Sequence, residues 1–534
     1  MKKISVILLN VRASKMMPGG LAILLIVLLT SCINDLNTEP LEGSTEMTSE
    51  VAWSDPAIYK QMLAKIYAGF SLTGNIGPSG MSDIVGIGDE GETAFLRCYW
   101  NLQNLTTDEA LCAWANNGIA EINFCTWTSS NRFVQFLYNR MFMNIAYCNE
   151  YLRNTTDEML AKRQVDNSLI ENIRQYRSEV IALRALNYYF LMDLYANVPL
   201  VDENLSIGSL PEQKNREFLF TWIEEQLKSV LGSLPEKSEL TYGRMNDYVV
   251  YTILSKMYLN AQIYIGQDKY SEAITCLKEI INSGEYILDL VYKNIFGAQN
   301  NLSTEIIFPI IFDGMNSTCY GGTIYLTSAA YDNEMSPSFG LSDGWSGLRA
   351  LENLVDKFEA GDVRALFWTE KRTKETGAWS DFNSGYSVVK YTNLNNDGTA
   401  GSHTLFPDTD FPLFRLADVY LMYAEAVLRG GSGGSLATAL GYVNDLRSRA
   451  GVSQINNSSL TLDFILDERC RELYWEGHRR TDLIRFDSYT KNYKWNWKNG
   501  VFVGTTNISD NYSIFPIPVQ ELAANKNLVQ NKGY

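Results

Sequence analysis

The sequence predicts a mostly α-helical protein in which helices pack in pairs, with long irregular loop regions and minor β structure. Three observations predict this fold. Apolar residues recur at helical spacing over several long segments, and only 13 prolines interrupt 534 residues. The third is composition, because apolar residues make up 46% and charged residues 20%, the balance of a globular chain rather than of a disordered one.

The chain is predicted to begin with a secretion signal, residues 1–31. Basic residues precede the apolar run 21–29, which is too short to span a bilayer as a helix. The run ends in Leu29-Thr-Ser-Cys32, which resembles a bacterial lipobox, so we expect lipidation at Cys32 and attachment to a membrane through this lipid. A lipidated tether then covers residues 32–50. The alternative interpretations are an uncleaved anchor and a buried cysteine.

The charge balance excludes some classes of function. Lys+Arg is 45 and Asp+Glu is 61, so the net charge is −16, the chain repels phosphate backbones, and nucleic-acid binding is not expected. The two histidines, His403 and His478, exclude a multi-histidine metal site, and no cofactor is expected. Apart from Cys32 there are seven cysteines, an odd number without a C-x-x-C motif, so we expect most of them in the core.

Helical periodicity marks segments from one end of the mature chain to the other. The segments with the strongest pattern are residues 171–196, 216–231, 247–265, 270–281, 416–429, 436–450 and 462–475. Two pairs among them, 247–265 with 270–281 and 416–429 with 436–450, resemble tetratricopeptide units. Pairs of this kind bury a continuous core by stacking, so the helices are expected to form the scaffold.

Two long irregular stretches, residues 72–130 and 297–410, lie between the helical segments and are rich in aromatic residues. Loops of this size are usually functional. We therefore expect an N-terminal region with tetratricopeptide-like helices over residues 51–300, and a C-terminal region with further pairs and ligand-face loops over residues 301–534. Exposed flat rings stack on the apolar faces of sugars, whereas a single tryptophan is more often a core residue. The aromatic candidates are Trp100, Trp114, Trp127, Tyr320, Trp345 and Trp368.

Two glycine motifs match catalytic or cofactor patterns but lack the necessary context. Gly86-Ile-Gly88-Asp-Glu-Gly91 matches the dinucleotide loop, yet its acidic residues would face the pyrophosphate and no βαβ unit follows. Gly430-Gly-Ser-Gly-Gly434 matches a nucleophile elbow but lies between two predicted helices. Both are interpreted as turns.

Clusters of acidic residues could form a cation-binding site or the active site of a glycosidase, but a solvated surface is the better interpretation. Asn393-Leu-Asn-Asn-Asp-Gly398 resembles the start of a calcium loop, but Thr404 stands where the bidentate glutamate is needed, so a structural cation is only an alternative to a turn. Carboxylate pairs such as Asp467 with Glu468 fall at i,i+3 or i,i+4 from arginines, which predicts a salt-bridged surface.

Several stretches, taken in order, resemble the SusD/RagB family of outer-membrane lipoproteins of Bacteroidetes. They begin at the lipobox and run to the C-terminal Phe515-Pro-Ile-Pro518. Between these ends the matching stretches are Leu105-Thr-Thr-Asp-Glu109, Thr126-Trp-Thr128, residues 177–190, Glu305-Ile-Ile-Phe308, residues 415–426, residues 443–451 and residues 465–486.

The resemblance implies a cell-surface protein without catalytic activity. Such a protein binds an oligosaccharide and acts as a lid on a SusC-type TonB-dependent transporter of the outer membrane. It also implies ligand contacts at Trp127 and Asn131, in and after the Trp-Thr segment, and at the acidic pair Asp108 and Glu109. Where many members carry an Arg- or Gly-rich loop, this chain has Leu111-Cys-Ala-Trp114.

The departure from the family pattern makes Trp114 a candidate platform for a sugar ring. Tyr320 and Trp345 follow Glu305-Ile-Ile-Phe308, in a loop where binding aromatics occur in the family. Other readings stay open: a lid that captures peptides or glycopeptides, a surface glycosidase, and an adhesin without a ligand.

Overall fold

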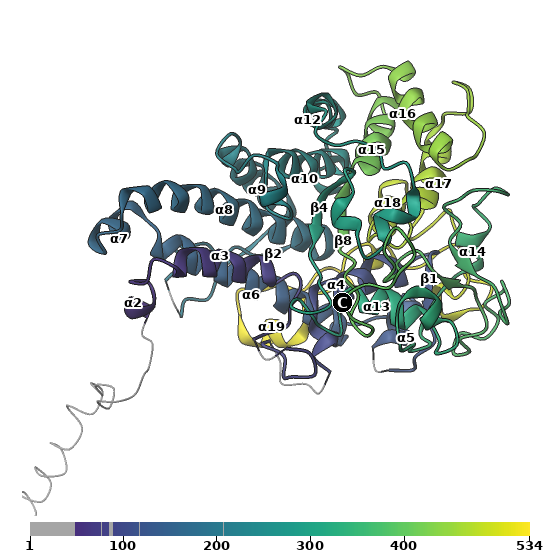
Figure 1. Ribbon diagram of the computed structural model, residues 1–534, viewed down its shortest axis with the longest axis horizontal. Coiled ribbons are helices and arrows are strands. Elements are labelled where there is room, and N and C mark those ends of the chain that lie inside the picture. The colour runs from purple at the N-terminus through teal and green to yellow at the C-terminus, as the bar shows by residue number, and fades with distance from the viewer. Residues whose placement is uncertain (1–48, 76, 85–88, 117, 207) are drawn as a thin grey trace, which may run out of the picture. The chain divides into compact units, whose positions relative to one another are not determined.

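The computed structural model describes residues 49–75, 77–84, 89–116, 118–206 and 208–534 (Figure 1). The predicted signal, Cys32 and the tether up to residue 48 lie outside the described residues. Two units are separated at residue 55, and the first contains one short described helix, α2 (Ser49–Ala52). Within the described ranges, no helix is long and apolar enough to cross a membrane.

One group of helices forms a scaffold in which neighbours along the chain pack against each other (Figure 1). Helix α6 packs on α8, α8 on α9, and α10 on α12. Polar side chains cap the N-termini of two of these helices. Asp166, before α8, accepts from the Ser168 amide, and Asn246, before α10, accepts from the amides of Tyr248 and Val249. The members of this group are α3 (Ile58–Ala68), α6 (Arg132–Asn154), α7 (Asp157–Lys162), α8 (Asn167–Tyr195), α9 (Arg216–Val230), α10 (Asp247–Leu259), α11 (Ala261–Ile265) and α12 (Tyr270–Ser283).

A second group continues the stack from α12 onto α15. It contains α15 (Leu416–Leu428), α16 (Leu436–Arg449), α17 (Leu462–Leu473) and α18 (Arg479–Arg485). The predicted mostly helical fold with paired helices is confirmed. The predicted segment 247–265 divides at Asn260, where the backbone leaves the helical conformation (φ −95°, ψ 3°) and the side chain donates to the Lys256 carbonyl and accepts from Arg485.

The remaining elements are short and join the loops. The described strands form antiparallel pairs: β1 (Ala110–Cys112) with β5 (Leu348–Ala350), β2 (Val198–Pro199) with β3 (Gln213–Lys214), β4 (Ile306–Ile310) with β8 (Phe411–Arg415), and β6 (Phe367–Trp368) with β7 (Ser387–Val388). The β1–β5 pair joins the two aromatic loop stretches, and the Ala113 amide extends it by donating to the Gly347 carbonyl at 2.8 Å. Loops far apart in the sequence therefore meet.

Glu468, which was expected on the surface, and Glu476 on the segment that follows α17 both lie in the interior. Helix α17 ends at Leu473, because Tyr474 has a ψ of 143° and Trp475 a φ of 63°, and both of these side chains are buried. Glu476 accepts from Arg415 at 2.6 Å and from Lys390 at 2.6 Å, and all three side chains are buried. Glu468 pairs with Arg471 as its spacing predicts, but that pair is buried as well. The predicted salt-bridged surface is wrong here because these ions hold the C-terminal helices to the loops.

Candidate functional site

A hollow of about 350 Å³ opens where the two aromatic loop stretches meet. Three of its lining residues are aromatic, come from both stretches, and are among the candidates named from the sequence. The strand pair β1–β5 ends beside it, which fixes the loops that carry the rings. The lining consists of Asp89, Arg97, Trp114, Asn116, Tyr320 and Trp345.

The three rings form a continuous, partly exposed aromatic surface. The ring centroids of Trp114 and Trp345 are 6.5 Å apart with an interplanar angle of 39°, and those of Tyr320 and Trp345 are 6.1 Å apart at 47°. The indole N–H of Trp114 donates to the Trp345 carbonyl at 3.1 Å, and that of Trp345 donates to Asp343 at 3.0 Å. Because these polar edges are engaged, the ring faces are what the hollow offers to a ligand.

Glycines allow the rings to approach this closely. A Cβ added to Gly347 would lie 2.4 Å from Cε2 of Trp114, and one added to Gly91 would lie 2.5 Å from the carbonyl carbon of Tyr320. Gly91 lies in the 3-10 helix η1 (Glu90–Thr93), where the Tyr320 amide donates to the Glu90 carboxylate at 2.9 Å. The last glycine of the apparent dinucleotide motif therefore serves close packing against the aromatic loop.

A charged edge completes the hollow. Arg97, on helix α4 (Phe95–Trp100), is 3% exposed and donates to Asp89 at 3.2 Å. Its guanidinium carbon lies 5.8 Å from the Trp114 ring. The Asp89 side chain is 49% exposed and Asn116 is exposed, so both can exchange water for the hydroxyls of a ligand. The arrangement suits a molecule with apolar faces and polar rims.

Comparison with known proteins agrees with this geometry. Residues 367–534 match the family model described as the SusD family. The starch-binding protein SusD of Bacteroides thetaiotaomicron is 33% identical to this chain, over 95% of the chain and 96% of its own length. The chain belongs to the SusD family. The resemblance inferred from the sequence motifs is confirmed.

Solved structures show that SusD-type proteins share the fold. A SusD superfamily protein of Bacteroides vulgatus has a TM-score of 0.70 and 18% identity, covering 90% of this chain and 99% of its own. The surface glycan-binding protein A of Bacteroides thetaiotaomicron, solved with laminarihexaose, has a TM-score of 0.69 and 22% identity, covering 89% and 98%. A relative of Formosa agariphila, the SusD-like protein P2, is 22% identical over 96% of this chain and 98% of its own.

The acidic pair that the SusD resemblance suggested for the ligand face is in the interior. Asp108 is fully buried and binds Arg479 through both carboxylate oxygens, at 2.7 and 2.8 Å. Burial raises the pKa of Asp108, but the Arg479 guanidinium outweighs it and holds the pKa at about 2. Glu109 is 1% exposed and accepts from the Trp475 amide at 3.0 Å; burial raises its pKa to about 7. Both residues hold the C-terminal segment.

The Trp-Thr segment is also interior in this member of the SusD family. Trp127 is 1% exposed, and its indole N–H donates to the Tyr534 hydroxyl at 2.9 Å. Asn131 is 3% exposed and caps α6 by accepting from the amides of Phe133 and Val134. The structure therefore places neither residue at the hollow, because one anchors the C-terminal residue and the other starts a helix.

Sequence reasoning missed the polar lining of the hollow. Arg97 carries no sequence signal, because it lies on a short helix that is otherwise buried and apolar. Asp89 was noticed only as part of a glycine motif. Asn116 follows Trp114 by two residues on an exposed loop, and that proximity was the one available signal.

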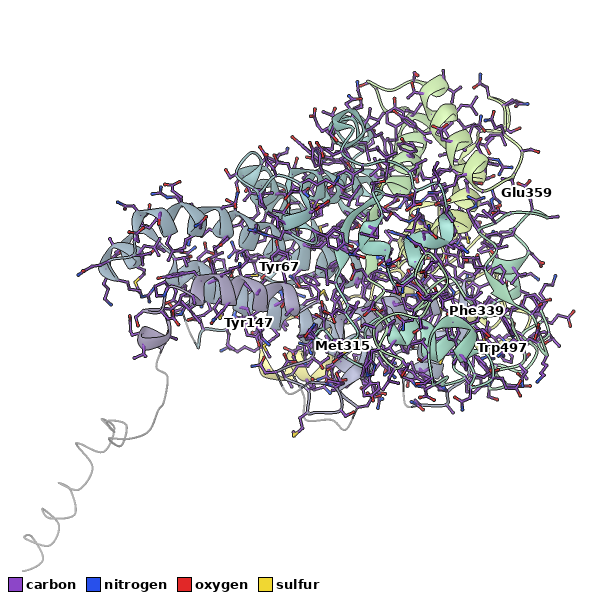
Figure 2. The ribbon with its side chains drawn as sticks, viewed as in Figure 1. Tyr67, Tyr147, Met315, Phe339, Glu359 and Trp497 are labelled. Carbon is purple, nitrogen blue, oxygen red and sulfur yellow. The ribbon has the colours of Figure 1, made fainter. Side chains whose placement is uncertain are left out.

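Another cavity, of about 390 Å³, lies elsewhere in the described part of the chain, between α3, α8 and β4. Its lining is mostly apolar, and the hydroxyl of Tyr67 is already bound to Glu179 at 2.6 Å, as that of Tyr242 is to Asp410 at 2.7 Å. Figure 2 shows Tyr67 among the scaffold helices. This cavity offers few free polar groups, so it does not suit a hydroxyl-rich ligand. Among the described residues no group of three His, Cys, Asp or Glu side chains is placed to hold a metal ion.

Proposed function

We propose that this protein binds a glycan at the cell surface, in the hollow formed by Trp114, Tyr320 and Trp345. The single observation that carries the proposal is the meeting of three partly exposed rings, from two distant loops, beside charged and amide groups. Sugars present apolar ring faces and polar rims, and this lining complements both. A relative named for starch binding and a neighbour solved with laminarihexaose support the same ligand class.

We propose further that the protein is anchored to the outer membrane by a lipid on Cys32 and covers a SusC-type TonB-dependent transporter as a lid. In this scheme binding alone, without catalysis, retains the oligosaccharide until the lid closes. A glycosidase needs two carboxyl groups across the scissile bond. Of the described lining residues, Asp89 alone carries a carboxylate. That lining favours capture over hydrolysis.

Affinity electrophoresis of the chain from residue 33 onward against plant, microbial and host glycans tests the proposal. We expect retardation by at least one glycan and its loss in Trp345→Ala. Removing the burial of one large ring costs about 1.5–3 kcal/mol, which raises Kd about 10- to 100-fold.

Trp222→Ala is the matched control, because Trp222 is also a partly exposed tryptophan but lies on α9 against Tyr188. It should migrate as the wild type does. Equal retardation of wild type and Trp345→Ala would refute the site. If no glycan retards the wild type but an oligopeptide library is bound, the peptide-capturing lid replaces the proposal.

A further inference from the structure

A second hollow, of about 190 Å³, lies at the far end of strand β5 from the first. Trp345 precedes the strand and Glu352 follows it, so seven residues (352 − 345) separate the two hollows along the chain. A fully extended segment of that length spans at most about 25 Å. The second hollow is lined by Glu352, Asn353, Lys494, Asn496, Phe502 and Val503.

Polar groups with unused hydrogen-bonding capacity converge on this hollow. Asn496 fixes its two neighbours: its side chain donates to Oε1 of Glu352, and its backbone amide donates to Oδ1 of Asn353 at 3.1 Å. Oε2 of Glu352 is buried and is left without a hydrogen-bond partner. Within the described part of the chain, the Asn353 amide nitrogen and the Lys494 ammonium have none either. One acceptor and two donors match adjacent hydroxyls, each of which donates and accepts.

An exposed aromatic ring stands beside these groups. Val501, Phe502 and Val503 are 42, 40 and 59% exposed, a run of apolar side chains that folding alone does not require. The Phe502 ring centroid lies 5.7 Å from that of Trp497. Figure 2 labels Trp497 among the loops, on the opposite side of the view from Tyr67 and the scaffold helices.

The loop that carries Phe502 is held in place rather than left free. The Trp497 amide donates to the Val501 carbonyl at 3.0 Å, and the Trp497 indole N–H donates to the Thr376 carbonyl at 2.7 Å. The Asn499 amide donates to the Phe124 carbonyl at 2.9 Å. Asn499 and Trp497 have positive φ angles, of 63° and 69°. Two such left-handed residues persist only where the surroundings fix them.

We propose that this second hollow is a further sugar-binding site. Phe502 stacks on the apolar face of a sugar ring, while Glu352, Asn353 and Lys494 bind its hydroxyls. Only the ligand class rests on the proposed function; the site itself rests on its own lining. Two sites at the ends of one strand bind a polymer more tightly than either site alone, because the second contact becomes intramolecular.

Isothermal titration of the chain from residue 33 onward with maltohexaose and with laminarihexaose tests the site. We expect two sugar sites in the wild type with one of these probes. In Trp345→Ala the site that remains is the second one, and Phe502→Ala in that background should raise its Kd by at least about 10-fold, while Phe502→Tyr retains it. Val519→Ala, which alters a similarly exposed side chain on the short helix α19 (Val519–Ala524), is the control and should change nothing.

The outcomes separate the two proposals. If the wild type shows one site that Trp345→Ala removes and Phe502→Ala leaves intact, the second site is refuted and the proposed function stands. If Phe502→Ala removes binding and Trp345→Ala does not, the first site is refuted and the second stands. Absence of heat with both hexasaccharides refutes the second site, while the proposed function is decided separately by the glycan panel of the electrophoresis experiment.

Discussion

Replacing Asp108 by asparagine tests whether this residue is a structural ion or a ligand contact. Its two carboxylate oxygens accept from Arg479, and Oδ2 also accepts from the Tyr493 hydroxyl at 2.7 Å, all within the interior. The pKa of Asp108 is about 2 instead of 3.8. At about 1.4 kcal/mol per pKa unit, this lowering corresponds to roughly 2–3 kcal/mol of stability at neutral pH.

The substitution also leaves Arg479 buried without its counter-ion, which raises the expected loss to about 3–5 kcal/mol. The unit from residue 56 onward has 479 residues (534 − 55), and at about 2.1 cal/mol/K per residue its unfolding entropy is about 1 kcal/mol/K. The apparent Tm should therefore fall by about 3–5 °C. Differential scanning calorimetry at one scan rate measures this shift.

The pH dependence has a defined sign. Because the folded pKa of Asp108 is depressed, its contribution is complete above pH 4 and is lost as the pH falls toward 2. The Tm difference between wild type and Asp108→Asn should shrink over the same interval. Asp89→Asn is the comparison for stability: the Asp89 side chain is 49% exposed, and Arg97 keeps a second carboxylate partner in Glu92 at 3.8 Å, so its Tm should fall less. An unchanged Tm together with weakened glycan binding in Asp108→Asn would refute the structural role.

Two further substitutions test the packing and the electrostatics. Gly91→Ala should lower both Tm and glycan affinity, because its Cβ would lie 2.5 Å from the Tyr320 backbone. The control is Gly441→Ala on α16, whose Cβ would have no atom within 4 Å and which should be neutral or stabilising. Calorimetry and titration measure both variants, and equal effects of the two substitutions would contradict the packing role of Gly91. Burial and the nearby Lys256 lower the pKa of His478 to about 3, so the unfolded chain binds the additional proton and stability falls as the pH decreases from 6.5 toward 3. His478→Asn should flatten the Tm profile between pH 4 and 6.5, and an unchanged slope would contradict the assignment.

The scaffold could be predicted from the sequence because its signals are local. Residues 216–231 were predicted as a helix from their apolar spacing, and α9 spans Arg216–Val230. Helix α6 was missed, although Asn131 at its start is a cap. The same asparagine was assigned to the ligand face by resemblance. A helix cap and a ligand contact use the same side-chain chemistry. In the structure, the amides of the next residues, Phe133 and Val134, show that Asn131 is a cap.

The site was partly predictable for a different reason. Trp114, Tyr320 and Trp345 were singled out as rings on long loops, and the structure brings them together. That meeting depends on the pairing of two three-residue strands, β1 and β5, whose partners Ala110 and Ala350 are 240 positions apart (350 − 110). Nor could the sequence show that Asp108 is buried, because charged residues are mostly exposed and its arginine lies 371 positions away.

The most direct measurement is a crystal structure of the protein with the oligosaccharide that affinity electrophoresis selects. We expect sugar rings against the faces of Trp114, Tyr320 and Trp345, with hydroxyls bound by Asp89 or Asn116. A ligand bound only at another surface, with these three rings still exposed to solvent, would contradict the proposed site. Glycan density at the rings would establish the binding function that the two loop stretches are proposed to serve.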